Sequence, residues 1–237
     1  MYIIGFIFYT FIIGVFCVKK LLDTIVPKFT RLPLILVLSS NFIVYYLTLF
    51  LLPQDINRYD LSLSIDGQIP TIPFFVLIYV LAFVQWVASY VFHSRDSELT
   101  CYKVTTAGII AKLICLIFFI ALPTVITIPE VTGNGFFEWG TRFIHSADRP
   151  YNLFPSIHCL ESWLCFRGAM MLNKKNYYYI TFQGVFTLLV FASTLFIKQH
   201  FIVDIPAGIL VCEIGLFLSC RVKGYRIMEK INHLVIK

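Results

Sequence analysis

Two histidines in the second half of the chain lie at the edges of apolar runs, beside small polar residues. His158 follows Pro155 and Ser156, and His200 precedes Asp204 by four residues. Residues four apart share one face of a helix, so we expect the carboxylate of Asp204 to hold one nitrogen of the His200 imidazole. The other nitrogen would then be free, as a nucleophile or a proton-transfer group requires.

Positive charge and backbone N–H groups are expected beside these imidazoles. Pro155 suits the first position of a helix, where its missing N–H costs nothing. The N–H groups of the next three residues would then point toward the preceding loop, and a helix N-terminus of this kind favours an anion. The cations expected at the same level are Arg142, Arg149 and Lys198.

This pattern predicts a phosphate site. One histidine would attack phosphorus, the other would protonate the leaving oxygen, and the cations would stabilise charge on the phosphoryl group. No cluster of carboxylates suggests a Mg²⁺ site, and no C-x-x-C motif occurs. We therefore expect a reaction that uses neither a metal nor another cofactor.

The elements that must position these residues are membrane helices. The 237 residues are 59% hydrophobic and only 14% charged, and mean hydropathy is +0.82. A helix needs about 20 residues to cross the hydrocarbon layer, and backbone in lipid must be helical or form a closed barrel. Seven apolar runs lie near that length: 2–18, 33–52, 72–92, 106–128, 155–172, 177–197 and 201–220. We predict an all-α, polytopic helix bundle that forms one domain over residues 1–237.

The basic residues predict the orientation of this bundle. Placing the N-terminus outside makes 19–32, 93–105, 173–176 and 221–237 the inner loops, which hold thirteen of the nineteen Lys and Arg residues. By the positive-inside rule the chain is N-out and C-in, with the site at the extracytoplasmic face. In a bacterium this membrane would be the plasma membrane. Topology accounts for the net charge of +6, so we do not expect nucleic acid as a partner.

Charged and polar residues outside the motifs are expected to have simpler roles. Lys112 and Arg167 fall within apolar runs, near ends from which a long side chain reaches the interface. Glu161 would either tune His158 or lie in a wet cleft, and we favour the cleft. Loop 53–71 reads as a solvated connector. The histidines expected to face water are His93, His145 and His233.

Residues 142–204 contain Arg-x6-Arg-Pro, Pro-Ser-x-His and Ser-x6-His-x3-Asp in that order. The order resembles the type 2 phosphatidic acid phosphatase superfamily, whose pattern is Lys-x6-Arg-Pro, Pro-Ser-Gly-His and Ser-Arg-x5-His-x3-Asp. The resemblance implies a six-helix core, here with one extra N-terminal helix. It also implies that His200 is the nucleophile, that Asp204 orients it and that His158 is the general acid. The phosphate-binding residues that it implies are Arg142, Arg149, Ser156 and Ser193.

The chain departs from that pattern at three positions. Arg142 stands in place of Lys, Ile157 in place of Gly, and Thr194 in place of Arg. The last change removes a phosphate ligand, and Lys198, one helical turn later, is the candidate to replace it. The string from Asp148 to His158, with Lys198-Gln199-His200, is similar to the branch that includes inositol phosphorylceramide synthases.

Three functions follow as hypotheses. The first is a membrane lipid-phosphate phosphatase that acts through a phosphohistidine intermediate, on a substrate such as phosphatidic acid, phosphatidylglycerol phosphate or a polyprenyl pyrophosphate. The second is a lipid phosphotransferase, similar to inositol phosphorylceramide or sphingomyelin synthases, that moves a phospho-headgroup to a hydroxyl acceptor. The third, from another class, is haem binding or a proton relay through His158 and His200. The partners expected for the first two are a lipid phosphate and the bilayer.

Overall fold

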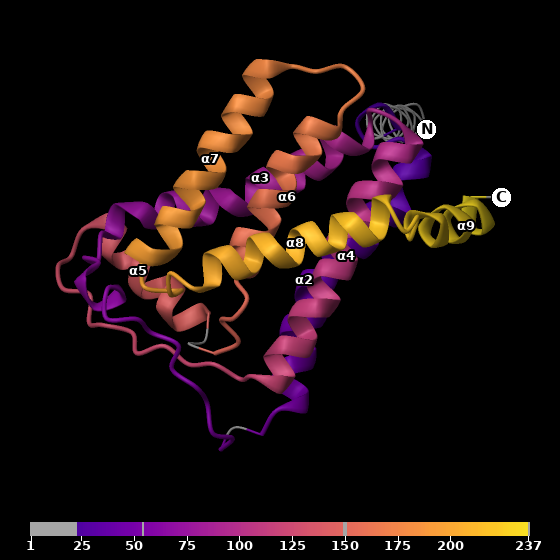
Figure 1. The fold of residues 1–237 in the computed structure, drawn as a ribbon. Helices are drawn as coiled ribbons and strands as arrows, with labels where there is room; N and C mark the ends of the chain where they lie inside the picture. Colours follow the sequence, from indigo (N-terminus) through magenta and orange to yellow (C-terminus); the bar gives the residue numbers. More distant parts are fainter. Residues whose placement is uncertain (1–22, 54, 149–150, 237) are drawn as a thin grey trace, which may run out of the picture.

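A computed structural model describes residues 23–53, 55–148 and 151–236, and this part of the chain is helical, with two isolated β-bridges and no strand. Figure 1 shows the arrangement. The 3-10 helices are η1 (Asp66–Gln68) and η2 (Pro73–Phe75). The α-helices are α2 (Lys28–Leu51), α3 (Val76–Ser94), α4 (Glu98–Ala121), α5 (Phe136–Ala147), α6 (Ile157–Met171), α7 (Tyr177–Phe196), α8 (Asp204–Cys220) and α9 (Tyr225–Ile236).

Several of these helices can cross a membrane. Among the described residues four are long and apolar enough: α2, α3 together with η2, α4 and α7. The pair α8 and α9 makes a fifth if it is counted as one span with a bend of 64°. The chain therefore has the architecture of a multi-pass integral membrane protein. The first predicted run, 2–18, lies outside the described residues.

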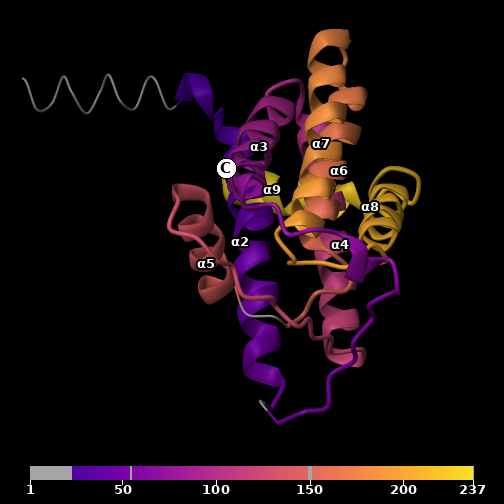
Figure 2. The same ribbon diagram turned by 90° about the vertical axis from the view of Figure 1, so that its left-hand side faces the viewer.

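Some helices begin or end at residues other than the ends of the predicted apolar runs, because capping residues determine where a helix starts. α4 begins at Glu98 rather than at residue 106, because Ser97 is its N-cap and accepts the N–H of Thr100 at 3.1 Å. Pro123 follows its last turn. The connection between the predicted runs 106–128 and 155–172 contains α5, a short helix on the outside of the bundle that packs against η2 and α3 (Figure 2). Its exposed aromatic residues, which suit a membrane interface, are Phe136, Trp139 and Phe143.

The centre of the bundle is α4, which packs against α2, α3, α6 and α8. Two glycines let α8 approach its neighbours closely. A Cβ at Gly215 would lie 2.6 Å from the carbonyl oxygen of Ala107 on α4, and a Cβ at Gly208 would lie 2.7 Å from that of Ser156. Because no side chain fits at these points, α8 is held directly against the backbone at the start of α6.

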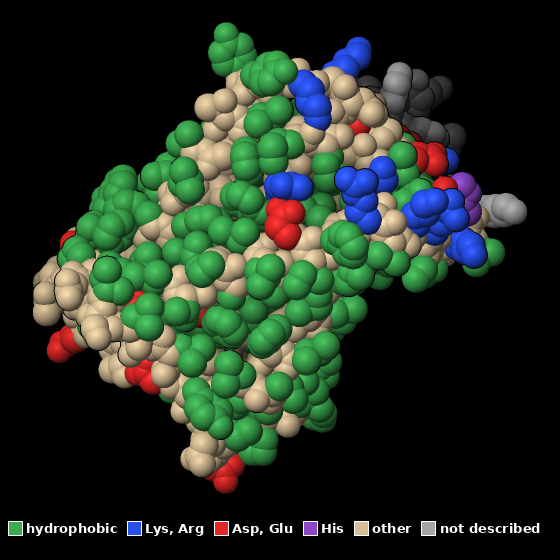
Figure 3. All heavy atoms as spheres, in the orientation of Figure 1, with side chains coloured by type: hydrophobic (Ala, Val, Ile, Leu, Met, Phe, Trp, Pro, Cys, Tyr) green, Lys and Arg blue, Asp and Glu red, His purple; other side chains and the backbone are tan. Residues whose placement is uncertain are grey.

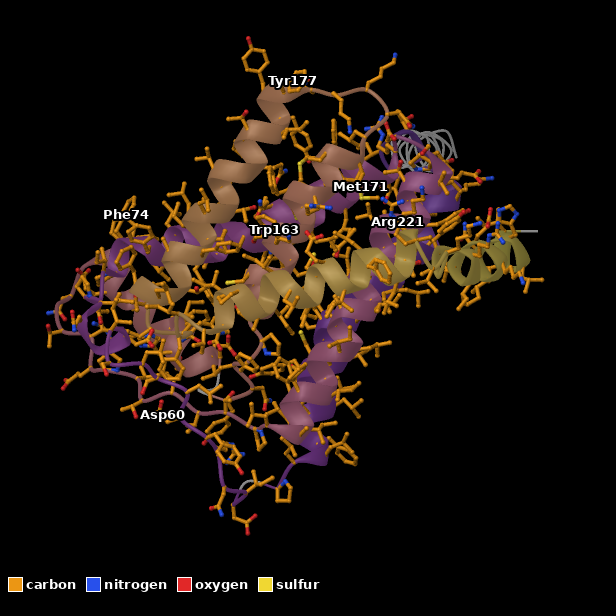
Figure 4. The ribbon with its side chains drawn as sticks, in the orientation of Figure 1. Asp60, Phe74, Trp163, Met171, Tyr177 and Arg221 are labelled. Carbon is orange, nitrogen blue, oxygen red and sulfur yellow. The ribbon has the colours of Figure 1, made fainter. Side chains whose placement is uncertain are left out.

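The connections gather at two ends of the bundle. One end, here called the site end, holds residues 52–53, 55–75, 122–148, 151–156 and 197–203. Isolated β-bridges join its segments, from Tyr59 to Thr124 and from Val125 to Tyr151. The opposite end holds 95–97, 172–176 and 221–224. There the N–H of Asn173 donates to the Asp96 carboxylate at 3.1 Å. Figure 4 shows Asp60 and Phe74 toward the first end and Met171 and Arg221 toward the second.

A buried ion pair crosses the middle of the bundle. Lys112 and Glu161 are fully buried, with Nζ and Oε1 2.6 Å apart. Lys112 also donates to the carbonyl of Val37, and the Tyr90 hydroxyl donates to Glu161 Oε2, both at 2.6 Å. The expectations that Lys112 reaches the interface and that Glu161 lies in a wet cleft are therefore wrong, because each finds an opposite charge inside the protein.

Arg167 behaves closer to expectation. Its guanidinium is 3.3 Å from Glu213 on α8, and both side chains are more than a third exposed. The indole of Trp163 donates to the same carboxylate at 2.7 Å. Arg167 therefore stays near the surface, although it pairs with an acid of the same bundle.

Candidate active site

The imidazole of His200 is held by Asp204, as the spacing predicts. Nδ1 of His200 lies 3.1 Å from Oδ2 of Asp204, which also accepts the N–H of Phe201 at 2.9 Å. The expectation that both residues share a helix face is wrong, because α8 begins at Asp204 and His200 lies in the turn before it. The carboxylate reaches back across that turn, so the predicted contact forms by a different geometry.

The turn that carries His200 is fixed by the way α7 ends. Lys198 has a φ of 56°, the left-handed conformation that follows many helices. Its N–H donates to the carbonyl of Leu195 at 3.1 Å, and the N–H of Gln199 donates to that of Thr194 at 2.9 Å. This pair of bonds is a Schellman motif. A lysine in this conformation costs about 1 kcal/mol relative to an ordinary helical one. The hydrogen bonds of the motif therefore hold the backbone before His200 in a conformation that lysine disfavours.

His158 lies in the first turn of α6. Ser156 is the N-cap, and its hydroxyl accepts the N–H of Cys159 at 3.3 Å. Pro155 therefore lies one residue before the cap, not at the first helical position as expected. The N–H of Ser156 approaches the carbonyl of Asp204 at 3.5 Å, which joins the start of α6 to the start of α8.

The two imidazoles lie close together. The ring centroids of His158 and His200 are 6.0 Å apart and the planes are inclined by 56°. Aromatic side chains surround His158: Tyr79 stacks on it at 4.1 Å, and Trp86 and Phe83 lie at 5.0 and 5.4 Å. Nε2 of His158 is buried, with no hydrogen-bond partner among the described residues. The hydrogen-bonding capacity of this nitrogen is therefore unused within the described residues.

A carboxylate behind the stacked ring was not foreseen as part of the site. The hydroxyl of Tyr79 donates to Oδ2 of Asp148 at 3.2 Å. Burial raises the pKa of the Asp148 carboxyl, whereas the charge of His200 and the bond from Tyr79 act in the opposite direction. Asp148 lies within the Arg-x6-Arg-Pro motif, so the sequence contained a signal for its place in the site. Tyr79 lies in an apolar run and gave none.

A pocket of about 520 Å³ opens beside His200 at the site end. Polar side chains from three loops line it together with apolar ones. The polar residues of the lining, besides His200, are Asp60, Ser62, Ser64, Asp66, Thr71, Thr127 and Lys198. His158 does not line it, so the pocket lies on the His200 side of the pair.

Asp66 anchors loop 53–71 against the site. Its carboxylate is mostly buried and accepts the N–H groups of Leu63 at 2.7 Å and Ile202 at 2.9 Å. Nζ of Lys198 donates to the carbonyl oxygen of Asp66 at 3.0 Å. The expectation of a solvated connector is therefore wrong for this part of the loop.

The predicted phosphate ligands are placed unevenly. Ser156 caps α6 beside His158, and Lys198 lines the pocket with His200. The guanidinium of Arg142 donates instead to the carbonyls of residues 131 and 133, at 2.9 and 2.7 Å. The hydroxyl of Ser193 donates to the carbonyl of Val190 at 2.7 Å. Arg149 lies outside the described residues.

The three remaining histidines are separate from this pair. His93 is buried, contrary to expectation, because Nε2 lies 3.1 Å from the hydroxyl of Tyr179. Nε2 of His145 lies 2.7 Å from the carbonyl of Ile197. The side chain of His233 is 56% exposed, as expected. In the described part of the chain no group of three or more His, Cys, Asp and Glu residues could hold a metal ion.

Comparison with models of protein families, with curated proteins and with solved structures gave no match. Assignment of a reaction therefore depends on the geometry around His158 and His200 and on the motifs that contain them.

Proposed function

We propose that the protein is a membrane lipid-phosphate phosphatase that acts through a phosphohistidine intermediate. The observation that carries this proposal is the pair of imidazoles 6.0 Å apart, one of them bound through Nδ1 to a buried carboxylate. The rings are close enough for nitrogens of both to reach atoms bound to one phosphorus. A single phosphoryl group can therefore touch both rings.

The first half of the reaction forms the intermediate. Nε2 of His200 attacks phosphorus, the ester P–O bond breaks, and His158 gives its proton to the leaving oxygen. Asp204 keeps the proton of His200 on Nδ1 and stabilises the positive ring that results. The aromatic side chains around His158 provide no negative charge. The bound phosphate supplies it and so favours the protonated form of His158.

The second half restores the protein. His158, now neutral, takes a proton from water as the water oxygen attacks phosphorus. The P–N bond to His200 breaks and inorganic phosphate leaves. The N-terminus of α6 and Lys198 stabilise charge on the phosphoryl oxygens. We keep Arg142, Arg149 and Ser193 as proposed ligands because of the resemblance in the motifs.

Two features of the whole chain support the same proposal. We propose that α2, α3, α4, α6, α7 and α8 form the six-helix core that the resemblance implies. The described cations are concentrated at the opposite end of the bundle, and among the described residues only Arg58, Arg142 and Lys198 lie at the site end. The positive-inside rule then favours an extracytoplasmic site.

Transfer to an alcohol is the second candidate, and the pocket beside His200 favours it. Hydroxyl and carboxylate groups line much of this space, as the recognition of a polar headgroup requires. A headgroup that remains on phosphorus during attack by His200 would have room there. A phosphatase for monoesters needs no such space.

Lipid labelled in the phosphate and, separately, in the glycerol separates the two candidates. The purified chain in micelles should release free phosphate from phosphatidic acid. A new phospholipid, formed only when an alcohol acceptor is present, would assign transfer. His200→Ala should abolish either product, and His158→Gln should slow turnover by about 10²–10⁴. His233→Ala is the control, because this exposed residue lies outside the site. Equal turnover by the His200→Ala variant would refute the proposal.

A further inference from the structure

α9 has one face that is fixed to the rest of the bundle. It follows α8 after a bend of 64°. Met228 and Asn232, one turn apart, are buried. Nδ2 of Asn232 donates to the carbonyl of Phe29 and to the hydroxyl of Tyr102, each at 2.8 Å. α9 therefore lies against the ends of α2 and α4, at the opposite end from the site.

A second face of α9 is apolar and uncovered in the described structure. Ile227, Ile231 and Leu234 are 66%, 43% and 77% exposed. The spacing of four and then three residues places them in one stripe along the helix. A stripe of this kind at the end of a membrane bundle is suited to the boundary between headgroups and acyl chains.

Cations gather beside this stripe. Arg226 and Lys230 form an adjacent row on α9, and Figure 3 shows Lys and Arg side chains clustered over the ends of α8 and α9. Three more come from nearby: Arg221 and Lys223 from the connection to α8, and Lys103 from α4. Nζ of Lys103 lies 5.6 Å from the centre of the Tyr225 ring.

The cations of this group lack ion-pair partners within the described residues, although Glu229 lies between Arg226 and Lys230 in the sequence of α9. None of the five cations forms an ion pair with a carboxylate there. The nearby Glu98 lies 4.0 Å from His233. Unpaired cations next to an exposed apolar stripe are complementary to a surface that is both anionic and greasy, which a bilayer leaflet with acidic lipids provides.

We propose that α9 and its connection to α8 bind anionic lipid headgroups of the leaflet at the opposite end from the site. Ile227, Ile231 and Leu234 enter the acyl boundary, and the five cations contact phosphate and carboxylate groups. Nucleic acid or an acidic protein would use the cations but leave the apolar stripe exposed to water. This surface is separate from the phosphate site and does not depend on the proposed reaction.

The test titrates phosphatidylserine or phosphatidylcholine into micelles of the full chain and follows the thermal unfolding midpoint. A ligand that binds only the folded state raises this midpoint. Phosphatidylserine should raise the midpoint more than phosphatidylcholine. The difference should shrink as salt rises from 50 to 500 mM, because the Debye length falls from about 14 to about 4 Å. A contribution of about 1 kcal/mol per cation is a fivefold change in affinity, so R226Q/K230Q should raise the phosphatidylserine concentration needed for a given midpoint shift by about 25-fold.

Two matched variants make the result specific. K174Q/K175Q removes two exposed cations at the same end of the bundle and should keep the response. His200→Ala should also keep it, which separates this surface from the phosphate site. Equal responses to the two lipids, an unchanged response in R226Q/K230Q, or saturation by soluble glycerol phosphate alone would each overturn the proposal.

Discussion

The two imidazoles of the site are held in different ways. Nδ1 of His200 is bound to a buried carboxylate, which sets the tautomer and leaves Nε2 as the nitrogen that the proposed reaction uses. His158 has no such partner and is fixed by the rings of Tyr79, Phe83 and Trp86. The arrangement of His200 suits a nucleophile. The arrangement of His158 suits a general acid that donates its proton to a bound ligand.

The Asp148 carboxyl gives a prediction for the dependence of stability on pH. Its pKa is raised by burial, so the folded chain holds this proton more tightly than the unfolded chain. The free energy of unfolding must then fall as pH rises from the usual pKa of Asp, about 3.9, through the raised value. Asp148→Asn should remove this fall while still accepting the bond from Tyr79.

The measurement is the thermal unfolding midpoint in detergent, at steps from pH 4 to pH 7, for the wild type and Asp148→Asn. Glu229→Gln on α9 is a control for the loss of one carboxylate elsewhere. A wild-type midpoint that rises across this window relative to Asp148→Asn would contradict the direction of the shift.

The spacing of residues along the chain predicts contacts in the site only where the two partners are close in sequence. His200 and Asp204 are predicted together because four residues separate them, although the contact forms across a turn rather than along a helix. Tyr79 and Asp66 lie far along the chain from the residues they support, in an apolar run and in a connector. Tertiary packing alone brings them to the site, and no local pattern encodes it.

At the scale of elements, the ion pair between Lys112 and Glu161 ties α4 to α6. Removal of one member of a buried pair leaves an unpaired charge and costs about 3–5 kcal/mol. Lys112→Met should therefore destabilise the chain strongly. K112M/E161Q should recover much of that loss, because a neutral amide still accepts the hydroxyl of Tyr90.

Unfolding of the two variants and of Glu161→Gln, followed by titration with a denaturing detergent, completes a double-mutant cycle. Lys174→Met is the control for loss of an exposed lysine. If the effects of the two single changes simply add in the double variant, the pair is not coupled and this interpretation fails.

Hydropathy predicts the helices better than their ends. Six of the seven apolar runs correspond to helices in the described residues, because long apolar segments have few alternatives in lipid. The start of α4 depends on the Ser97 cap, and α5 is an amphipathic helix within a segment read as loop. The first is decided by a local polar contact and the second by the periodicity of its apolar side chains, and a mean hydropathy registers neither.

At the scale of the whole molecule, the distribution of cations predicts which end faces outward. Gln68 is exposed at the site end and Lys174 at the opposite end. In intact cells a membrane-impermeant maleimide should label Gln68→Cys, and it should label Lys174→Cys only after permeabilisation. The unsubstituted chain gives the background from native cysteines. Labelling in the reverse order would show that the orientation is inverted and would move the proposed reaction to the cytoplasmic face.

Glu161 lies three residues beyond His158 on α6, and through it Lys112 and Tyr90 hold that helix from two sides. α6 therefore cannot slide along its axis without separating opposite charges in a nonpolar interior. The height of the His158 ring relative to His200 is set before any lipid arrives. A rigid template of this kind leaves discrimination between substrates to the loops above it. Substitution of Asp60, Ser62 and Ser64, which line the pocket, should therefore alter selectivity and leave the proposed chemical step intact.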